Sequence, residues 1–200
     1  MIAIIDYDGG NTKSILNVLN RCQIKYCVTS ERDKIMDCSK IILPGVSNFS
    51  FCMNSLKKKN LDKIIKDAVL DKKKPFLGIC SGMQILGTFS EEGNAEGLNI
   101  IPGKIKKIPI SKSKIVPHVG WNKIKFKASK LTNNVKNYTR FYFCHSYFFE
   151  PNNPEHCLMK TNYVIDFCSG INFEHIYGIQ LHPEKSLLEG MMIIKNFSKI

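Results

Sequence analysis

The first half of the chain alternates short apolar runs with stretches of helical periodicity, and this alternation constrains the fold more than any other feature. Each apolar run ends at a turn or before a polar residue, and apolar side chains then recur every three or four positions. The strand-like runs are residues 2–6 (IAIID), 24–29 (IKYCVT), 40–45 (KIILPG) and 76–79 (FLGI). Strands separated by helices build parallel βαβ units. The sequence therefore predicts an α/β fold with a mostly parallel, doubly wound sheet and flanking helices.

Helices are expected between these strands. Asn11 can cap the first one, a long helical pattern runs from Leu56 to Val69 until Pro75 forbids its continuation, and residues 81–89 open another helix. The second half is mostly strand-like, with Asn, Pro and Gly turns, and is expected to add antiparallel strands before a closing helix at residues 184–200. No linker or repeat interrupts the chain, so residues 1–200 are predicted to form a single domain.

Composition narrows the class of protein. The chain is 44% hydrophobic and 23% charged, and no apolar run approaches the length of about 20 residues that a membrane span needs. Eight cysteines are scattered without a CxxC pair, which indicates neither a zinc site nor a disulfide framework. We expect a cytoplasmic protein with reduced thiols, no metal and no cofactor.

The net charge of +12 raises the question of nucleic acid. Lysines cluster at residues 57–59, 72–74 and 112–114, but no aromatic residues are interleaved with them. A solvated surface is the favoured interpretation, and no nucleic-acid partner is expected. A binding module remains an alternative, which would show salt-sensitive binding to DNA or RNA.

Cys80 lies between two glycines directly after the apolar run at 76–79. The pattern Gly78-x-Cys80-x-Gly82 has the form of a nucleophile elbow, in which a strand turns sharply into a helix. The start of a helix favours the nucleophilic thiolate. By itself the pattern also fits a cysteine that is simply packed at the end of a strand.

A second strand-like run ends in His182-Pro183-Glu184. A cysteine nucleophile needs a base, and the base needs an acid that orients it. Pro183 restricts the backbone between them, so the imidazole and the carboxylate can meet. Separately, His182 also fits a surface turn and Glu184 fits the first turn of a helix, but together with the elbow they indicate a catalytic triad.

A third strand ends at LPGVSNF, residues 43–49. Its Pro-Gly pair is expected to leave backbone N–H groups of Gly45, Val46 and Ser47 free at the carboxyl edge of the sheet. One of them and the N–H of Ser81 would form an oxyanion hole, whose donors are often worth about 3 kcal/mol each in the transition state. A plain strand-to-loop turn is the alternative.

Together these residues resemble the class I glutamine amidotransferases, which carry an elbow cysteine and a His-Pro-Glu sequence. The similarity covers nearly the whole chain. The motif order is similar to that of the glutaminase subunits of imidazole glycerol phosphate synthase, through DYDGGN, LPGVSNF, GICSGMQIL, SEEG, GLNIIPG, VPHVGWN, FCHSY and GIQLHPEKS. This resemblance implies a flavodoxin-like amidotransferase fold.

The resemblance also implies a reaction. Cys80 would attack the side-chain amide of glutamine, with His182 as base and Glu184 as its orienting acid, while Gly45, Val46 and Ser81 stabilise the oxyanion. The amino-acid end of glutamine would contact Gln84, Glu92, Ser146 and Tyr147.

By the same resemblance, ammonia would pass to a (β/α)8-barrel synthase subunit that makes imidazole glycerol phosphate and AICAR, the two proteins forming a heterodimer. Asn11, Trp121 and Lys185 match positions at or near that interface. Their ordinary interpretations are a helix cap, a core aromatic and a solvated charge.

Three positions depart from the family pattern. Asp8 and Ser47 stand where the family usually has Gly, and Ser81 stands where it usually has a hydrophobic residue. The alternative function is therefore a paralogous amidotransferase that supplies ammonia to a synthetase modifying a surface-polysaccharide sugar. A cysteine peptidase on the same elbow fold is a further alternative. Peptidases of that kind generally lack the His-Pro-Glu sequence and the glutamine-holding residues.

Overall fold

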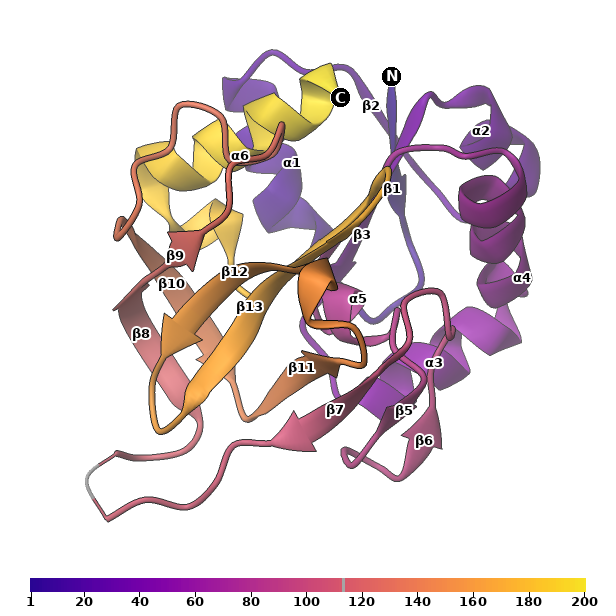
Figure 1. The fold of residues 1–200 in the computed structure, drawn as a ribbon. Coiled ribbons are helices and arrows are strands. Elements are labelled where there is room, and N and C mark those ends of the chain that lie inside the picture. The colour runs from indigo at the N-terminus through magenta and orange to yellow at the C-terminus, as the bar shows by residue number, and fades with distance from the viewer. Residues whose placement is uncertain (113) are drawn as a thin grey trace.

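The computed structural model describes residues 1–112 and 114–200, and its centre is a parallel sheet with helices on both faces (Figure 1). Five parallel strands lie side by side in the order β2 (Tyr26–Thr29), β1 (Ile2–Ile5), β3 (Lys40–Gly45), β4 (Phe76–Cys80) and β14 (Ile176–Ile179). β1, β4 and β14 are buried along their whole length, as expected for strands covered by helices on both sides. The α/β, doubly wound prediction is confirmed.

The helices divide the interior into two hydrophobic cores, one on each face of the sheet. α1 (Thr12–Arg21) and α6 (Leu187–Lys199) cover one face, and α2 (Arg32–Asp37), α3 (Phe49–Lys58) and α4 (Leu61–Lys66) cover the other (Figure 1). Leu19 and Phe197 belong to the first core, and Leu56 and Ile65 belong to the second. Burial of both faces holds the strand ends in fixed positions, which is a prerequisite for a preorganised site.

The second half extends the sheet with mostly antiparallel strands, as predicted. They are β7 (Gly103–Lys107), β9 (Lys125–Phe126), β11 (Tyr147–Pro151), β12 (Cys157–Asn162) and β13 (Asp166–Phe173). Two short strands that were not predicted, β5 (Phe89–Ser90) and β6 (Ala95–Glu96), precede them in the chain. β5 pairs in parallel with β7. β8 (His118–Lys123) and β10 (Arg140–His145) do not join this sheet and form a separate antiparallel ribbon.

Three helix predictions need correction. The pattern from Leu56 to Val69 is not one helix, because Asn60 adopts a left-handed conformation (φ 55°) between α3 and α4, and a π-helical turn, Asp67–Asp71, follows. The helix expected over residues 81–89 is only α5 (Ser81–Gln84), after which the chain turns into β5. The closing helix α6 begins three residues later than expected, after the short 3-10 turn Pro183–Lys185.

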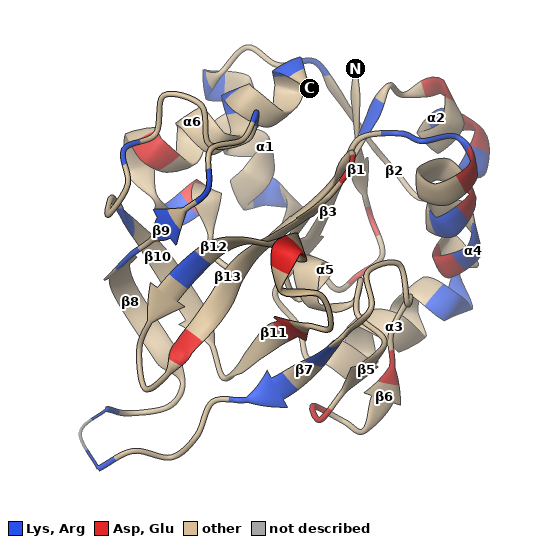
Figure 2. Ribbon diagram, viewed as in Figure 1, with Lys and Arg blue, Asp and Glu red and all other residues tan. Residues whose placement is uncertain are grey.

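The charged residues are dispersed over the molecule. In Figure 2, Lys and Arg segments are scattered over the helices, β7, β12 and the loop between β7 and β8, and they do not gather into one stripe. This distribution is typical of a solvated surface. Within residues 1–112 and 114–200, no helix is long and apolar enough to cross a membrane.

Candidate active site

Cys80 is the last residue of β4 and adopts a strained backbone conformation, φ 54° and ψ −113°. Such a turn presents the side chain at the carboxyl edge of the sheet. The flanking glycines allow it because backbones approach closely on both sides. A Cβ on Gly78 would lie 2.3 Å from the carbonyl oxygen of Gly82, and one on Gly82 would lie 2.0 Å from the carbonyl oxygen of Leu43. Cys80 is therefore held in an elbow, as the sequence pattern predicts.

His182 and Glu184 meet in the turn after β14. His182 Nδ1 lies 2.8 Å from Glu184 Oε1, and both side chains are buried. Burial alone would lower the pKa of His182, but hydrogen bonds to Cys80 and Glu184 outweigh it and raise that pKa to about 10. The imidazole thus links Cys80 to the carboxylate of Glu184.

Cys80 and His182 border a cavity of about 310 Å³ at the carboxyl edge of the sheet. All four predicted glutamine contacts line it, together with Cys80, His182 and Lys185; the remaining lining residues are Val46, Ser47, Asn48, Ser81, Pro117, Cys144 and His145. The structure thus brings the predicted nucleophile, base and binding residues to one place. A pocket of this size admits a small polar molecule.

The four binding candidates differ in how much of each side chain is left for a ligand. Gln84 Nε2 lies 2.9 Å from the carbonyl oxygen of Tyr147 and 2.8 Å from Gln180 Oε1, which uses both of its hydrogens. Gln84 Oε1 has no donor among the described residues. Glu92 Oε2 accepts the N–H of Phe49 at 2.8 Å, at the start of α3.

The predicted oxyanion donors are only partly in place. The N–H of Val46 is not free, because it donates to the carbonyl oxygen of Gly9 at 3.0 Å. Gly45 is the last residue of β3 and pairs with Cys80 in the sheet. The expectation of a free Val46 donor is therefore wrong for this conformation. The physical reason is that the segment after β1 passes beside this loop and offers a carbonyl oxygen.

Several contacts hold the loop of residues 44–47. The Tyr7 hydroxyl donates to the carbonyl oxygen of Pro44 at 2.9 Å. Burial of the Tyr7 side chain raises its pKa well above the usual value. The Ser81 hydroxyl donates to the carbonyl oxygen of Ser47 at 2.7 Å. Ser47 and Ser81, two of the three departures from the family pattern, therefore contact each other. The third, Asp8, is exposed and lies 2.9 Å from Lys59 Nζ.

Two buried histidines form a chain of hydrogen bonds that starts at the cavity wall with His145. His145 Nδ1 lies 2.8 Å from the carbonyl oxygen of Tyr147, so that nitrogen carries the hydrogen and Nε2 accepts. His118 Nδ1 then donates to His145 Nε2 at 3.0 Å, and Asn122 Nδ2 donates to His118 Nε2 at 3.2 Å. Burial lowers the pKa of His118 to about 4 and that of His145 to about 3, so both rings are neutral near pH 7.

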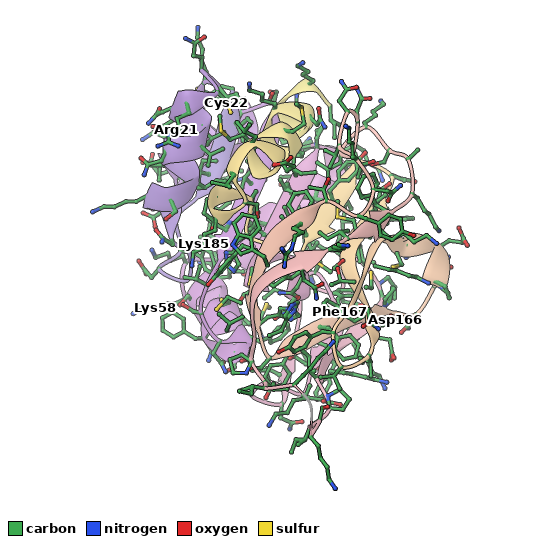
Figure 3. The ribbon with its side chains drawn as sticks, turned by 90° about the vertical axis from the view of Figure 1, so that its left-hand side faces the viewer. Arg21, Cys22, Lys58, Asp166, Phe167 and Lys185 are labelled. Atoms are coloured by element: carbon green, nitrogen blue, oxygen red, sulfur yellow. The ribbon has the colours of Figure 1, made fainter. Side chains whose placement is uncertain are left out.

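The predicted interface residues lie near one another at the surface beside the cavity. Trp121 is 41% exposed and meets the Tyr142 ring edge-on, with centroids 6.2 Å apart. Lys185 Nζ lies over the same Tyr142 ring, 5.1 Å from its centroid. Figure 3 shows Lys185 below Arg21 of α1, on the side turned toward the viewer. Asn11 caps α1 through Ser14, and Ser14 lines a small hollow together with Lys185.

Sequence reasoning missed Gln180 and His145. Gln180 is fully buried, and its Nε2 lies 3.5 Å from Cys80 Sγ. The available signal was a lone amide inside the apolar run IYGIQL, two residues before His182.

Within residues 1–112 and 114–200, no cluster of three or more His, Cys, Asp or Glu side chains is arranged to hold a metal ion.

Comparisons with known proteins agree with this geometry. A family model described as "Glutamine amidotransferase class-I" matches residues 3–200. The chain is 39% identical to the imidazole glycerol phosphate synthase subunit HisH of Leptospira borgpetersenii, with 100% of both chains covered. It is 42% identical to subunit HisH 2 of Methanococcus maripaludis, covering 100% of this chain and 99% of that protein. The structure of PurLQS from Thermotoga maritima has a TM-score of 0.76 at 18% identity, covering 98% of this chain and 96% of that one, which supports the fold alone.

Proposed function

This chain belongs to the class I glutamine amidotransferases and, within them, to the HisH subunits of imidazole glycerol phosphate synthase, and on that premise we propose that it is the glutaminase that supplies ammonia for imidazole glycerol phosphate in histidine biosynthesis. One observation carries the proposal. Cys80 and His182 border the same cavity as Gln84 and Glu92, and Glu184 bonds to His182 from behind it. We place the reaction in the cytoplasm, where the eight free thiols stay reduced.

The reaction follows from the positions of these groups. The Cys80 thiolate attacks the side-chain carbonyl carbon of glutamine, and the carbonyl electron pair moves onto oxygen. Protonated His182 gives its proton to the departing nitrogen. The carbon–nitrogen bond breaks, ammonia departs, and the acyl group remains on Cys80 as a thioester. His182 then takes a proton from water, which attacks the thioester and releases glutamate. Glu184 holds the imidazole in the required orientation throughout.

The polar groups of the cavity match the amino-acid end of glutamine. A free carboxamide oxygen on Gln84 and the carboxylate of Glu92 can accept hydrogen bonds from an α-ammonium group. Ser146 and Tyr147 border the same cavity and are assigned to the α-carboxylate side. These assignments make the site selective for a free amino acid over a peptide, which disfavours the peptidase alternative.

The oxyanion hole is completed only after a change in the loop of residues 44–47. The N–H of Ser81, beside the nucleophile, is one donor. The second is the N–H of Val46, which must leave the carbonyl oxygen of Gly9 and turn toward the cavity. We assign this rotation to the binding of a (β/α)8-barrel synthase subunit, and we expect the isolated chain to be nearly inactive. Loss of one such donor lowers kcat by about 100- to 1000-fold in other enzymes.

The proposed partner surface surrounds the mouth of the cavity. Trp121, Lys185 and Asn11 are assigned to it. Val46 (53% exposed) and Leu187 (70% exposed) add exposed apolar area to it. Exposed aromatic and aliphatic side chains of this kind are typical of a binding surface. A heterodimer would deliver ammonia to the synthase without passage through water, where protonation would remove its nucleophilicity.

Glutaminase assays of the reconstituted complex test the proposal. In Cys80→Ala, glutamine hydrolysis should disappear, while the complex still makes imidazole glycerol phosphate from added ammonium salt. Cys38→Ala is a matched control, because Cys38 is a buried thiol that does not border the cavity. Hydrolysis by Cys80→Ala at the parent rate would refute the function.

The same assay separates the two pathways. An imidazole glycerol phosphate cyclase-type barrel that binds the chain and raises its glutaminase rate supports the histidine pathway. Activation only by an ATP-dependent sugar-modifying synthetase would instead identify the paralogous amidotransferase.

A further inference from the structure

Gln180 follows β14 directly, and its backbone and side chain are both fixed. Its N–H donates to the carbonyl oxygen of Ser169 at 2.9 Å, and the side chain is fully buried. A buried carboxamide must find partners for its polar atoms. The two polar atoms of its carboxamide, Oε1 and Nε2, face two residues of the cavity, Gln84 and Cys80 respectively.

The orientation of the Gln180 carboxamide is determined by its neighbours. The carbonyl oxygen of Tyr147 can only accept, so the atom of Gln84 that lies 2.9 Å from it is the nitrogen. The second hydrogen of that nitrogen points to Gln180, 2.8 Å away, so the Gln180 oxygen faces Gln84. The Gln180 nitrogen is then the atom that lies 3.5 Å from Cys80 Sγ, within the range of an N–H···S hydrogen bond.

Besides the hydrogen bond to His182, Cys80 Sγ makes two contacts, at 4.0 Å to the carbonyl oxygen of Cys144 and at 3.5 Å to Gln180 Nε2. A thiol can donate to the Cys144 carbonyl oxygen. A thiolate has no hydrogen to donate and can only accept, from Gln180 and from His182. Hydrogen bonding to the charged form favours that form. Because Cys80 is only 5% exposed, water contributes little to the stabilisation of its negative charge.

We propose that Gln180 is a positioning residue of this site, which holds the Cys80 thiolate through its amide N–H and is itself oriented by Gln84. The inference deepens the proposed glutaminase and rests on it only for the identity of the substrate. Gln84 has one remaining polar atom, Oε1, assigned to the substrate, so a shift of Gln84 on glutamine binding passes through Gln180 to the nucleophile.

Alkylation of Cys80 by iodoacetamide, followed by mass spectrometry of the peptide that contains it, tests the inference without glutamine. In Gln180→Leu, the midpoint of the alkylation profile against pH should rise by about one unit, a tenfold smaller thiolate fraction. In Gln180→Glu, which keeps the shape and places an oxygen toward Cys80, it should rise at least as far. Loss of glutaminase activity should appear mainly in kcat.

The comparison isolates Gln180 because the other titratable groups are unchanged in the variants. Three of these groups interact with Cys80 directly: His182 after β14, Tyr7 after β1 and Cys52 on α3. Glu184 bonds to His182, and the other titratable residues that line the cavity are Glu92, Cys144, His145, Tyr147 and Lys185. Asn196→Leu is the matched control. Asn196 is a buried carboxamide on α6, donating to the carbonyl oxygens of Leu131 and Asn133, and its loss should leave the profile unchanged.

The outcomes are decisive in both directions. A profile for Gln180→Glu or folded Gln180→Leu that superimposes on the parent overturns the inference, and so does an equal shift in Asn196→Leu. If Gln180→Leu fails to fold, the isosteric Gln180→Glu alone decides. If the profile shifts but the parent chain lacks glutaminase activity even in complex with the synthase subunit, the role of Gln180 is supported and the proposed function is refuted instead.

Discussion

The Ser81 hydroxyl donates a 2.7 Å hydrogen bond to the carbonyl oxygen of Ser47, which ties the residue after Cys80 to the loop that we propose as the source of an oxyanion donor. In the same conformation, the neighbouring N–H of Val46 is occupied by Gly9. The Ser81–Ser47 contact therefore stabilises the loop with its donor turned away from the cavity. A hydrophobic residue at position 81 could not make this contact.

Replacement of Ser81 by alanine should release this loop. A hydrogen bond of this kind contributes about 1 kcal/mol, so we expect the glutaminase rate of the isolated chain to rise roughly fivefold. The activation by the synthase subunit should fall by a similar factor. Steady-state glutamine hydrolysis with and without the partner measures both quantities.

Ser198→Ala is the control for that experiment. Its hydroxyl also donates to a backbone carbonyl oxygen at 2.7 Å, that of Lys195, but on the exposed side of α6. This variant should leave both rates unchanged. An unaltered ratio of activated to basal rate in Ser81→Ala would show that the contact does not restrain the loop.

Replacement of Glu184 by glutamine should weaken the hydrogen bond that orients His182 without removing it. Oε1 still accepts from His182, but the negative charge is gone, and we expect about a tenfold loss of glutaminase activity because a charge-assisted hydrogen bond becomes a neutral one. His182→Ala should lose far more. Glu174→Gln, an exposed carboxylate on the opposite end of β14, is the control.

The same Glu184→Gln variant has a pH signature in stability. The pKa of His182 is raised to about 10, so its contribution to the free energy of unfolding is complete below about 6.5 and is lost as the pH rises through about 10. The variant should be less stable than the parent at pH 6, and the difference should shrink toward pH 10. Urea unfolding at several pH values measures it, and a difference that grows with pH would contradict the assignment.

The neutral histidine pair predicts the opposite behaviour in acid. Burial lowers the pKa of His118 to about 4 and that of His145 to about 3. Between about pH 6.5 and these values the unfolded chain binds protons that the folded chain does not, so stability falls as the pH falls. His118→Gln should flatten this acid loss relative to the parent. Parallel unfolding curves for the two proteins from pH 6.5 to 4.5 would argue against it.

Trp121 should contribute strongly to partner binding. Exposed aromatic residues at the centre of an interface are frequent hot spots, and Trp121→Ala should weaken binding of the barrel subunit by about 30-fold, equivalent to about 2 kcal/mol. Phe173→Ala, which removes another partly exposed aromatic side chain, should bind normally. Isothermal titration calorimetry distinguishes them, and equal losses would remove Trp121 from the interface.

Much of the fold and the triad could be predicted because both depend on local patterns. Apolar runs locate the strands, and residues directly after parallel strands share one edge, which brings Cys80 and His182 together. The break at Asn60 could not be predicted, because the apolar positions on both sides remain compatible with one helix. The orientation of the Val46 peptide was also inaccessible, since it depends on the carbonyl oxygen of Gly9, distant in the chain. Gln180 was missed because its role lies entirely in contacts made by folding.

The hydrogen bond from Val46 to Gly9 has a consequence for nitrogen use in the cell. One amide hydrogen cannot serve the carbonyl oxygen of Gly9 and a substrate oxyanion at the same time. Under the proposed function, a chain without its synthase subunit therefore does not hydrolyse glutamine, and ammonia is released only in the complex with that subunit. Under that function, the orientation of a single peptide unit would decide whether glutamine is consumed.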